Sequence, residues 1–193
     1  MINVAVEGEP DREVASAVVR AAGRSVNLVR VAGGKTRLDP LIPKYNRASV
    51  QTPWVVFRDS DSVCPVALRE DLGAGIAEWH PSFSLRIAHS MSEAWLLADP
   101  VSFSSFFSVP RNRVPADPES LRHAKRTVLA LCAGSRSSAV RRDMTYGDNR
   151  VGPLFVKRIN EYASTHWNPG TAAELSPSLR RAIERIRTLG VTS

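Results

Sequence analysis

The segment Pro53-Trp54-Val55-Val56-Phe57 is apolar throughout, and it constrains the fold more than any other feature of the sequence. A strand with one wet face alternates apolar and polar residues, whereas a continuous apolar run is typical of a strand buried on both faces of a parallel sheet. Other short apolar segments predict further strands, at residues 3–6, 26–32 and 83–88.

Helical segments alternate with these strands. Pro10 and Asp11 are typical of a helix start, and Gly23 is typical of a helix end. Helices are predicted at residues 11–22, 39–46 and 65–73, and another begins at Ser92. This alternation favours right-handed crossovers between parallel strands. We therefore expect an α/β fold with a Rossmann-like parallel sheet of about four strands flanked by helices.

The character of the chain changes after Asp99. Four prolines (Pro100, Pro110, Pro115 and Pro118) indicate a loop-rich connection, and later helices are predicted at residues 119–132, 151–164 and 178–189. In the last of these, apolar residues recur at helical spacing and form one stripe. The expected organisation is a sheet domain over residues 1–99, which would carry any catalytic site, and a basic helical extension over residues 100–193 packed on it.

The net charge of +7 is unevenly distributed. Residues 1–110 contain 11 Lys or Arg against 12 Asp or Glu, whereas residues 111–193 contain 15 against 7, a net charge of +8. This asymmetry indicates a polyanionic partner for the C-terminal part, although a solvated helical surface is the alternative. Because a guanidinium donates two parallel hydrogen bonds to phosphate, the candidate nucleic-acid-binding residues are Arg136, Arg141, Arg142, Arg180 and Arg181.

Composition also narrows the location and class of the protein. With 43% hydrophobic residues the chain can bury a core, and no apolar run approaches the roughly 20 residues of a membrane-spanning helix. The first residues lack the basic start of a secretion signal. Cys64 and Cys132 lie far apart without metal-ligand spacing, so we expect free thiols and a cytoplasmic location without membrane contact.

Three carboxylates follow two of the predicted strands. Glu7 comes directly after the first strand, and Asp59 and Asp61 come after the third. Ligands bind at the carboxyl ends of parallel strands, and residues two apart in an extended segment point to the same side. If the first and third strands are neighbours, the three acids meet and raise one another's pKa, which a bound Mg²⁺ or Mn²⁺ would relieve. Two such ions would suit the chemistry of a phosphodiester bond. Taken alone, however, the Glu-Gly and Asp-x-Asp motifs equally fit ordinary turns.

The residues at these two positions resemble the motifs of the Toprim domain. Glu7-Gly8-Glu9-Pro10-Asp11 is similar to its Glu-Gly-x-x-Asp segment, and Asp59-Ser60-Asp61 is similar to its Asp-x-Asp segment. This resemblance covers about residues 1–99. The whole chain resembles a family of small stand-alone bacterial Toprim-like proteins of unknown function, through segments 33–35, 93–99 and 176–179.

The resemblance implies chemistry and partners. Toprim domains occur in topoisomerases, primases and small nucleases, including the overcoming-lysogenization-defect type, and use these acids to bind Mg²⁺ and act on phosphodiesters. Tyr45, Tyr146 and Tyr162 stand in no context typical of a topoisomerase nucleophile, which favours a Mg²⁺- or Mn²⁺-dependent nuclease acting on nucleic acid, DNA more than RNA. Related Toprim nucleases are fused to, or encoded beside, ABC-type ATPases in phage-defence systems. Because this sequence has no nucleotide-binding motif, the resemblance implies a separate ATPase of the ABC or AAA type as its partner.

Two other functions compete with the nuclease. One is a non-catalytic Toprim-fold module that binds nucleic acid or a partner and regulates it. The other is a phosphatase with an Asp nucleophile, which is disfavoured because the Asp-x-Asp of such enzymes follows their first strand and not the third.

Further candidates flank the three acids. Glu93 is an additional metal ligand by resemblance to nuclease-type Toprim domains, or simply a favourable acid in a first helical turn. Lys35, after Gly33-Gly34, is a candidate catalytic cation for a scissile phosphate, with a solvated lysine on a flexible loop as the alternative. Asp99 is predicted to be a helix-ending turn residue, and His89 lies near the end of the fourth strand.

Overall fold

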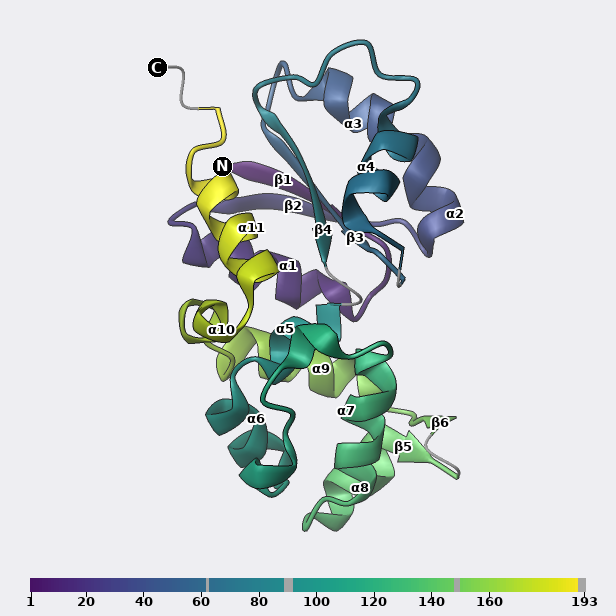
Figure 1. Cartoon of the computed structure of the whole chain (residues 1–193), viewed down its shortest axis with the longest axis vertical. Helices are drawn as coiled ribbons and strands as arrows, with labels where there is room; N and C mark the ends of the chain where they lie inside the picture. The colour runs from purple at the N-terminus through teal and green to yellow at the C-terminus, as the bar shows by residue number, and fades with distance from the viewer. Residues whose placement is uncertain (62, 89–91, 148–149, 191–193) are drawn as a thin grey trace.

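The computed structural model describes residues 1–61, 63–88, 92–147 and 150–190. Within these residues one parallel sheet has four strands in the order β2-β1-β3-β4 (Figure 1). The strands are β1 (Ile2–Val6), β2 (Val26–Val31), β3 (Trp54–Asp59) and β4 (Phe83–Ala88). The predicted α/β class and four-stranded parallel sheet are confirmed. β1 pairs with β3, so the strands that precede Glu7 and Asp59 are neighbours.

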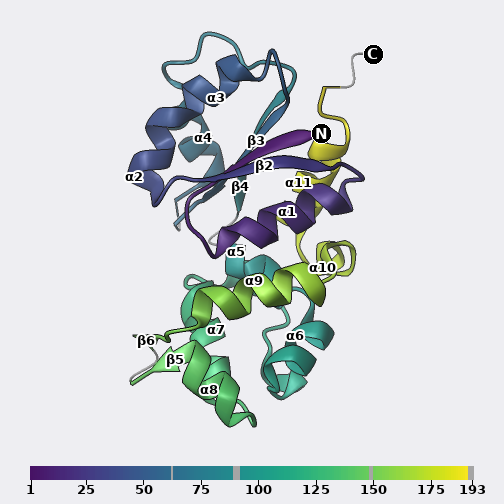
Figure 2. The same ribbon diagram turned by 180° about the vertical axis from the view of Figure 1, so that it is seen from behind.

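Helices cover both faces of the sheet. α1 (Asp11–Ala21) and α11 (Pro177–Arg187) lie on one face, and α2 (Lys35–Leu38), α3 (Ile42–Ala48) and α4 (Pro65–Gly73) lie on the other (Figures 1 and 2). Val55 belongs to the hydrophobic core under α1, whereas Val56 belongs to the core under α3. The β3 segment is apolar at successive positions because each face of the sheet has its own buried core.

A group of helices lies beyond one end of the sheet (Figure 1). It contains α5 (Ser92–Leu97), α6 (Pro100–Phe107), α7 (Ala124–Ala133), α8 (Ser138–Met144), α9 (Phe155–Thr165) and α10 (Pro169–Leu175). Short 3-10 helices η1 (Asp39–Leu41), η2 (Arg111–Arg113) and η3 (Pro118–Ser120) and a hairpin of β5 (Thr145–Tyr146) with β6 (Arg150–Val151) complete the described elements. α9 packs against α1, and α5 packs against α7 and α10. None of the described helices has the length and apolar character to cross a membrane.

The second half departs from the predicted elements in several places. The region after Asp99 contains α6, because the Asp99 side chain accepts a hydrogen bond from the Ser102 backbone N–H and caps the helix. Pro100 occupies the first helical turn, where its missing N–H costs nothing. Asp99 therefore closes the turn after α5, where its N–H donates to the Leu96 carbonyl oxygen at 3.5 Å, and it also starts α6. α8 and α10 were not predicted. The helix predicted at 39–46 is η1 followed by α3, with α2 before it, and α7 and α9 begin at residues 124 and 155, later than predicted.

Candidate functional site

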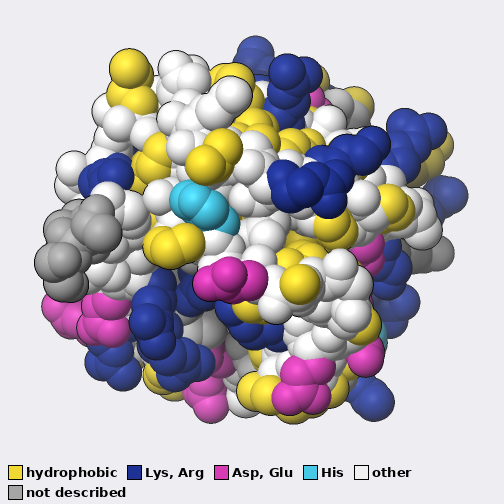
Figure 3. Space-filling model, turned by 90° about the horizontal axis from the view of Figure 1, so that it is seen from above, with side chains coloured by type: hydrophobic (Ala, Val, Ile, Leu, Met, Phe, Trp, Pro, Cys, Tyr) yellow, Lys and Arg dark blue, Asp and Glu magenta, His cyan; other side chains and the backbone are white. Residues whose placement is uncertain are grey.

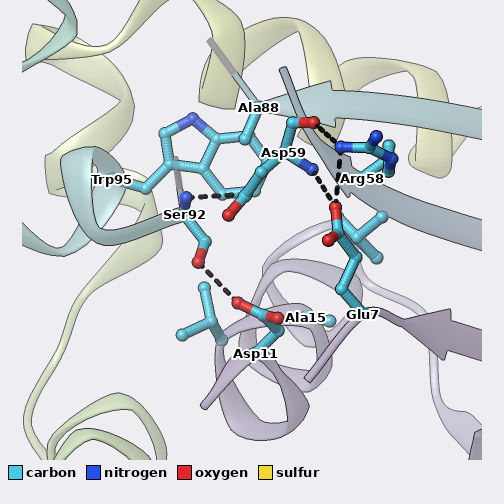
Figure 4. Close-up of a pocket in the computed structure, with 10 residues that line it drawn as sticks. Glu7, Asp11, Ala15, Arg58, Asp59, Ala88, Ser92 and Trp95 are labelled. Carbon is cyan, nitrogen blue, oxygen red and sulfur yellow. Dashed lines mark hydrogen bonds and ion pairs between the residues drawn. The ribbon is translucent and has the colours of Figure 1, made fainter. Parts of the chain in front are cut away.

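Glu7 and Asp59 lie side by side where β1 and β3 end. The Glu7 Oε1 atom accepts a hydrogen bond from the Asp59 backbone N–H at 2.8 Å (Figure 4). It also accepts one from Nη1 of Arg58 at 3.0 Å. The parallel pairing of β1 with β3 thus brings together two of the acids that the sequence predicted to meet.

A third acid, Asp11, joins this pair through Ser92. Asp11 stands in the first turn of α1, where its Oδ2 accepts the Gly8 N–H at 3.0 Å. The Ser92 hydroxyl donates to Asp11 Oδ1 at 2.6 Å, and the Ser92 N–H donates to Asp59 Oδ1 at 2.9 Å (Figure 4). The start of α5 therefore bridges the ends of β3 and α1.

Glu93 adds a fourth acid from α5. Its side chain is buried, with the residue only 5% exposed. Burial and the negative charge of Asp11 raise the pKa of Glu93 to about 7, against an ordinary value of 4.5. We call Glu7, Asp11, Asp59 and Glu93 the acidic cluster. No Lys or Arg among the described residues forms an ion pair with Asp11, Asp59 or Glu93.

The members of the acidic cluster perturb one another. Burial raises the pKa of Asp59 well above its usual range, and the charges of Asp11, Glu93 and Glu7 raise it further. Burial also raises the pKa of Asp11 and of Glu7, although Arg58 and the Asp59 N–H act in the opposite direction on Glu7. Clustered carboxylates whose neutral form is favoured are a feature of functional sites and of cation sites.

Arg58 separates the acidic cluster from a second set of acids. Its guanidinium is buried, donates from Nε to Asp39 Oδ1 at 2.9 Å and contacts Asp61 Oδ2 at 3.4 Å. It also donates to the Asp59 carbonyl oxygen. The charge of Arg58 is thus shared among Glu7, Asp39 and Asp61.

The sequence predicted that Asp61 would converge with Asp59, and in the structure the Asp61 carboxylate contacts Lys35 and Arg58 and its charge acts on Glu7. Asp61 has a φ of 50°, in the left-handed region, which interrupts the alternation of an extended strand. Its Oδ2 instead accepts from Nζ of Lys35 at 2.8 Å. Of the predicted catalytic set of Glu7, Asp59, Asp61 and Lys35, the first two are joined by a hydrogen bond, whereas Asp61 pairs with Lys35 and shares Nη1 of Arg58 with Glu7.

Gly33 and Gly34 place Lys35 at this edge but do not offer an anion site. Their N–H groups donate to the Glu7 carbonyl oxygen at 2.9 and 2.8 Å. Both residues have positive φ, 81° and 115°, so glycine suits these positions. The two N–H groups join the end of β2 to the end of β1.

A small pocket lies among these side chains (Figure 4). Its cavity volume is about 10 Å³, at the lower limit for one water molecule. The lining residues are Glu7, Asp11, Val14, Ala15, Phe57, Arg58, Asp59, Ala88, Ser92 and Trp95. Across residues 1–61, 63–88, 92–147 and 150–190, no three His, Cys, Asp or Glu side chains are arranged to hold one metal ion.

Trp95 joins the pocket to the far helices. Its ring makes an edge contact with Phe57, and its Nε1 donates to the Ser178 hydroxyl at 2.7 Å. Ser178 in turn donates to Glu119 Oε1 at 2.6 Å. Two segments that carried the full-length resemblance, 93–99 and 176–179, therefore contact each other and hold α5 in place.

The candidate phosphate-binding arginines do not form one surface. All five side chains are exposed. Arg141 and Arg142 lie on α8 with Arg136 just before it, whereas Arg180 and Arg181 lie on α11, at a distance from α8 in both ribbon views (Figures 1 and 2). On the face in Figure 3, Lys and Arg side chains form separate groups divided by other side chains.

Residue-by-residue reasoning missed Asp11, Arg58 and Ser92. Asp11 is the last residue of the Glu-Gly-x-x-Asp segment, but from the sequence we assigned it only to a helix start and not to the site. Arg58 and Ser92 carry no signal of their own, because their importance arises only when β1, β3 and α5 meet. His89 lies outside the described residues.

Comparison of the chain with protein-family models, curated proteins and solved structures finds no match. The Toprim resemblance therefore depends on its motif residues alone.

Proposed function

We propose that the chain hydrolyses phosphodiester bonds of nucleic acid with Mg²⁺ or Mn²⁺ bound at the acidic cluster. The observation that carries the proposal is the meeting of Glu7, Asp11, Asp59 and Glu93 at one end of the sheet. Among the described residues three of these acids form no ion pair, although the charge of Lys125 acts on Asp11 and Glu93. Buried carboxylates outside an ion pair are costly, and a hard divalent cation offsets that cost.

The available oxygens favour Glu7 and Asp59 as the ligands. Among the described residues, hydrogen bonds reach Glu7 Oε1 and Asp59 Oδ1 but not Glu7 Oε2 or Asp59 Oδ2. Mg²⁺ commonly uses one or two carboxylates and completes its shell with water and substrate phosphate, so a cluster of three protein ligands is not required. Bound there, the ion would supply a polarised water and positive charge for the phosphate oxygens.

Other residues of the chain have supporting roles in this proposal. Arg58 fixes the Glu7 carboxylate and the Asp59 backbone at hydrogen-bond distance. Asp11 and Glu93 add negative charge behind Asp59 and so favour a divalent over a monovalent ion. Lys35, which is half exposed, lies at the same edge of the sheet and would contact a substrate phosphate when its ion pair with Asp61 opens.

A non-catalytic nucleic-acid- or partner-binding module is the second candidate. The specific observation in its favour is the Arg58 guanidinium on Glu7, which already provides positive charge at one of the two proposed ligands. In that case the acidic cluster would be neutralised by Arg58 and protons, and no turnover would follow.

The test is cleavage of plasmid, single-stranded DNA and single-stranded RNA by the purified chain with Mg²⁺, with Mn²⁺ and with EDTA. Asp59→Asn and Glu7→Gln keep the shape of the side chains, and Glu174→Gln on exposed α10 is a matched control. We expect metal-dependent cleavage that falls at least about 100-fold in the first two variants and is unchanged in the control, since a metal ion contributes several kcal/mol to the transition state.

Two results would refute the nuclease. Cleavage that persists in both Asp59→Asn and Glu7→Gln would belong to a contaminant or to another site. A wild-type chain that binds nucleic acid but cuts none of the substrates with either ion would establish the binding module in its place.

A further inference from the structure

A second, larger cleft lies along the free edge of the sheet. β4 is the edge strand, and the cleft runs between α4, β4 and α11. Its cavity volume is about 1200 Å³, above the usual range for small-molecule pockets. A ligand that fills it would be a larger molecule or a stretch of polymer.

Arginines from three elements line this cleft. Arg69 comes from α4, Arg86 from β4, and Arg181 and Arg185 from α11. Glu184 is the acidic residue among the lining side chains, so the lining carries four positive charges and one negative charge. We call these four residues the arginine cleft.

Arg86 is the innermost of the four. Its Nε atom is buried and has no hydrogen-bond partner among the described residues. Burial lowers the pKa of Arg86 to about 10, and the charges of Arg69 and Arg185 lower it further. A buried donor surrounded by like charge lacks an acceptor and a countercharge, and an anion in the cleft supplies both.

Arg69 argues against an added peptide strand as the occupant. Its Nη1 donates to the Leu85 carbonyl oxygen at 3.3 Å, and its guanidinium stacks on Trp79. A strand that extends the sheet needs the carbonyl groups of the edge, and Arg69 already occupies one of them. Recognition in the cleft therefore comes from side-chain charge.

We propose that the arginine cleft binds the phosphate backbone of a single nucleic-acid strand. Arg69 and Arg185 both lie close enough to Arg86 to act on its charge, so the guanidinium groups converge on one stretch of backbone. Phe83 is the aromatic residue of the lining and is only 7% exposed, so no ring is offered for base stacking. Contacts from guanidinium groups to phosphates carry no sequence information, so we expect binding to be independent of base sequence.

The cleft also leads to the acidic cluster. β4 runs from Phe83 in the cleft to Ala88, which lines the acidic pocket and pairs with Asp59. A strand held along β4 would thus be directed toward the proposed metal site. This use of the cleft rests on the proposed function, whereas binding itself does not.

The experiment measures binding of a fluorescein-labelled, mixed-sequence single-stranded 20-mer by anisotropy in EDTA over a range of salt concentrations. Arg181→Gln with Arg185→Gln removes two cleft arginines. Arg180→Gln with Arg187→Gln removes two charges from the same helix outside the cleft lining. These four side chains are exposed, so both double variants should fold, which circular dichroism checks.

We expect the cleft variant to lose at least tenfold in affinity and the control variant to lose less than twofold. Four phosphate contacts give a slope of log affinity against log salt of about −3, and loss of two contacts brings it to about −1.5. Equal losses in the two variants would overturn the proposal, as would equally tight binding of polyglutamate or preferred binding of a duplex 20-mer.

Asp59→Asn distinguishes this proposal from the proposed function. It should leave binding in EDTA unchanged because Asp59 lies outside the cleft lining. Loss of cleavage with retained binding fits both proposals. If the wild type does not cleave nucleic acid and only the cleft variant loses binding, the proposed nuclease function is refuted and the proposal for the arginine cleft is supported.

Discussion

Replacing Glu93 with Gln tests whether the acidic cluster is held under electrostatic strain. Glu93 is 5% exposed, and burial together with the charge of Asp11 raises its pKa to about 7. In the unfolded chain the carboxyl has its ordinary pKa of 4.5. Between these two pH values the native state holds more protons than the unfolded state.

The sign and the size of the effect follow from this difference. Stability is highest below the unfolded pKa and is lost as pH rises from about 4.5 to about 7, since the unfolded state gains free energy by releasing the proton. At about 1.4 kcal/mol for each pKa unit, the full loss is about 3–4 kcal/mol of unfolding free energy. Because a Gln side chain has no such proton to release, the Glu93→Gln variant does not undergo this loss of stability.

Urea denaturation in EDTA at pH 5, 6, 7 and 8 measures the effect. We expect the unfolding free energy of Glu93→Gln to rise by about 2–3 kcal/mol relative to that of the wild type between pH 5 and pH 8. The exposed Glu174→Gln control should follow the wild type at every pH. A Glu93→Gln variant that is destabilised equally at all four pH values would refute the reasoning, because Glu93 would then not be a buried carboxyl that resists ionisation.

Two further predictions concern folding. Asp99→Ala should cost about 3 kcal/mol of unfolding free energy in urea, because it leaves both the first turn of α6 and the Asn168 N–H without an acceptor; a cost below about 0.5 kcal/mol would contradict this capping role. Gly152→Ala should lower the melting temperature by about 4–10 °C, since a Cβ there would lie 2.5 Å from the Met144 carbonyl carbon. Gly75→Ala, which meets nothing within 4 Å, is its control, and equal melting temperatures would contradict the close approach.

The sheet could be predicted because its signals are local. Each strand is a short apolar run with a polar or glycine-containing segment behind it, and each first-half helix lies between two such runs. The proximity of Glu7 to Asp59 could also be predicted, because the carboxyl ends of parallel strands lie at the same edge of a sheet. In the structure β1 pairs with β3, as this prediction requires.

The remainder depends on tertiary contacts that no local pattern encodes. Asp61 turns to Lys35 through one left-handed residue, and an alternation rule cannot anticipate that. Ser92 bridges Asp11 and Asp59 only because α5 packs beneath α1. Arg180 and Arg181 are the same residue type and adjacent in sequence, yet of the two only Arg181 lines the arginine cleft. In each case the side-chain direction is set by packing and not by residue type.

The return of α11 to the sheet has a consequence for biosynthesis. Leu179, Ile183 and Ile186 of this helix belong to the same hydrophobic core as Val4 and Val55. About 100 residues separate the end of β4 from the end of α11. At translation rates of ~5–20 residues per second, the part of this sheet face that α11 covers beside α1 stays exposed for roughly 5–20 s. An uncovered parallel sheet is open to intermolecular pairing, so the nascent chain should depend on holdase chaperones more than its modest size implies.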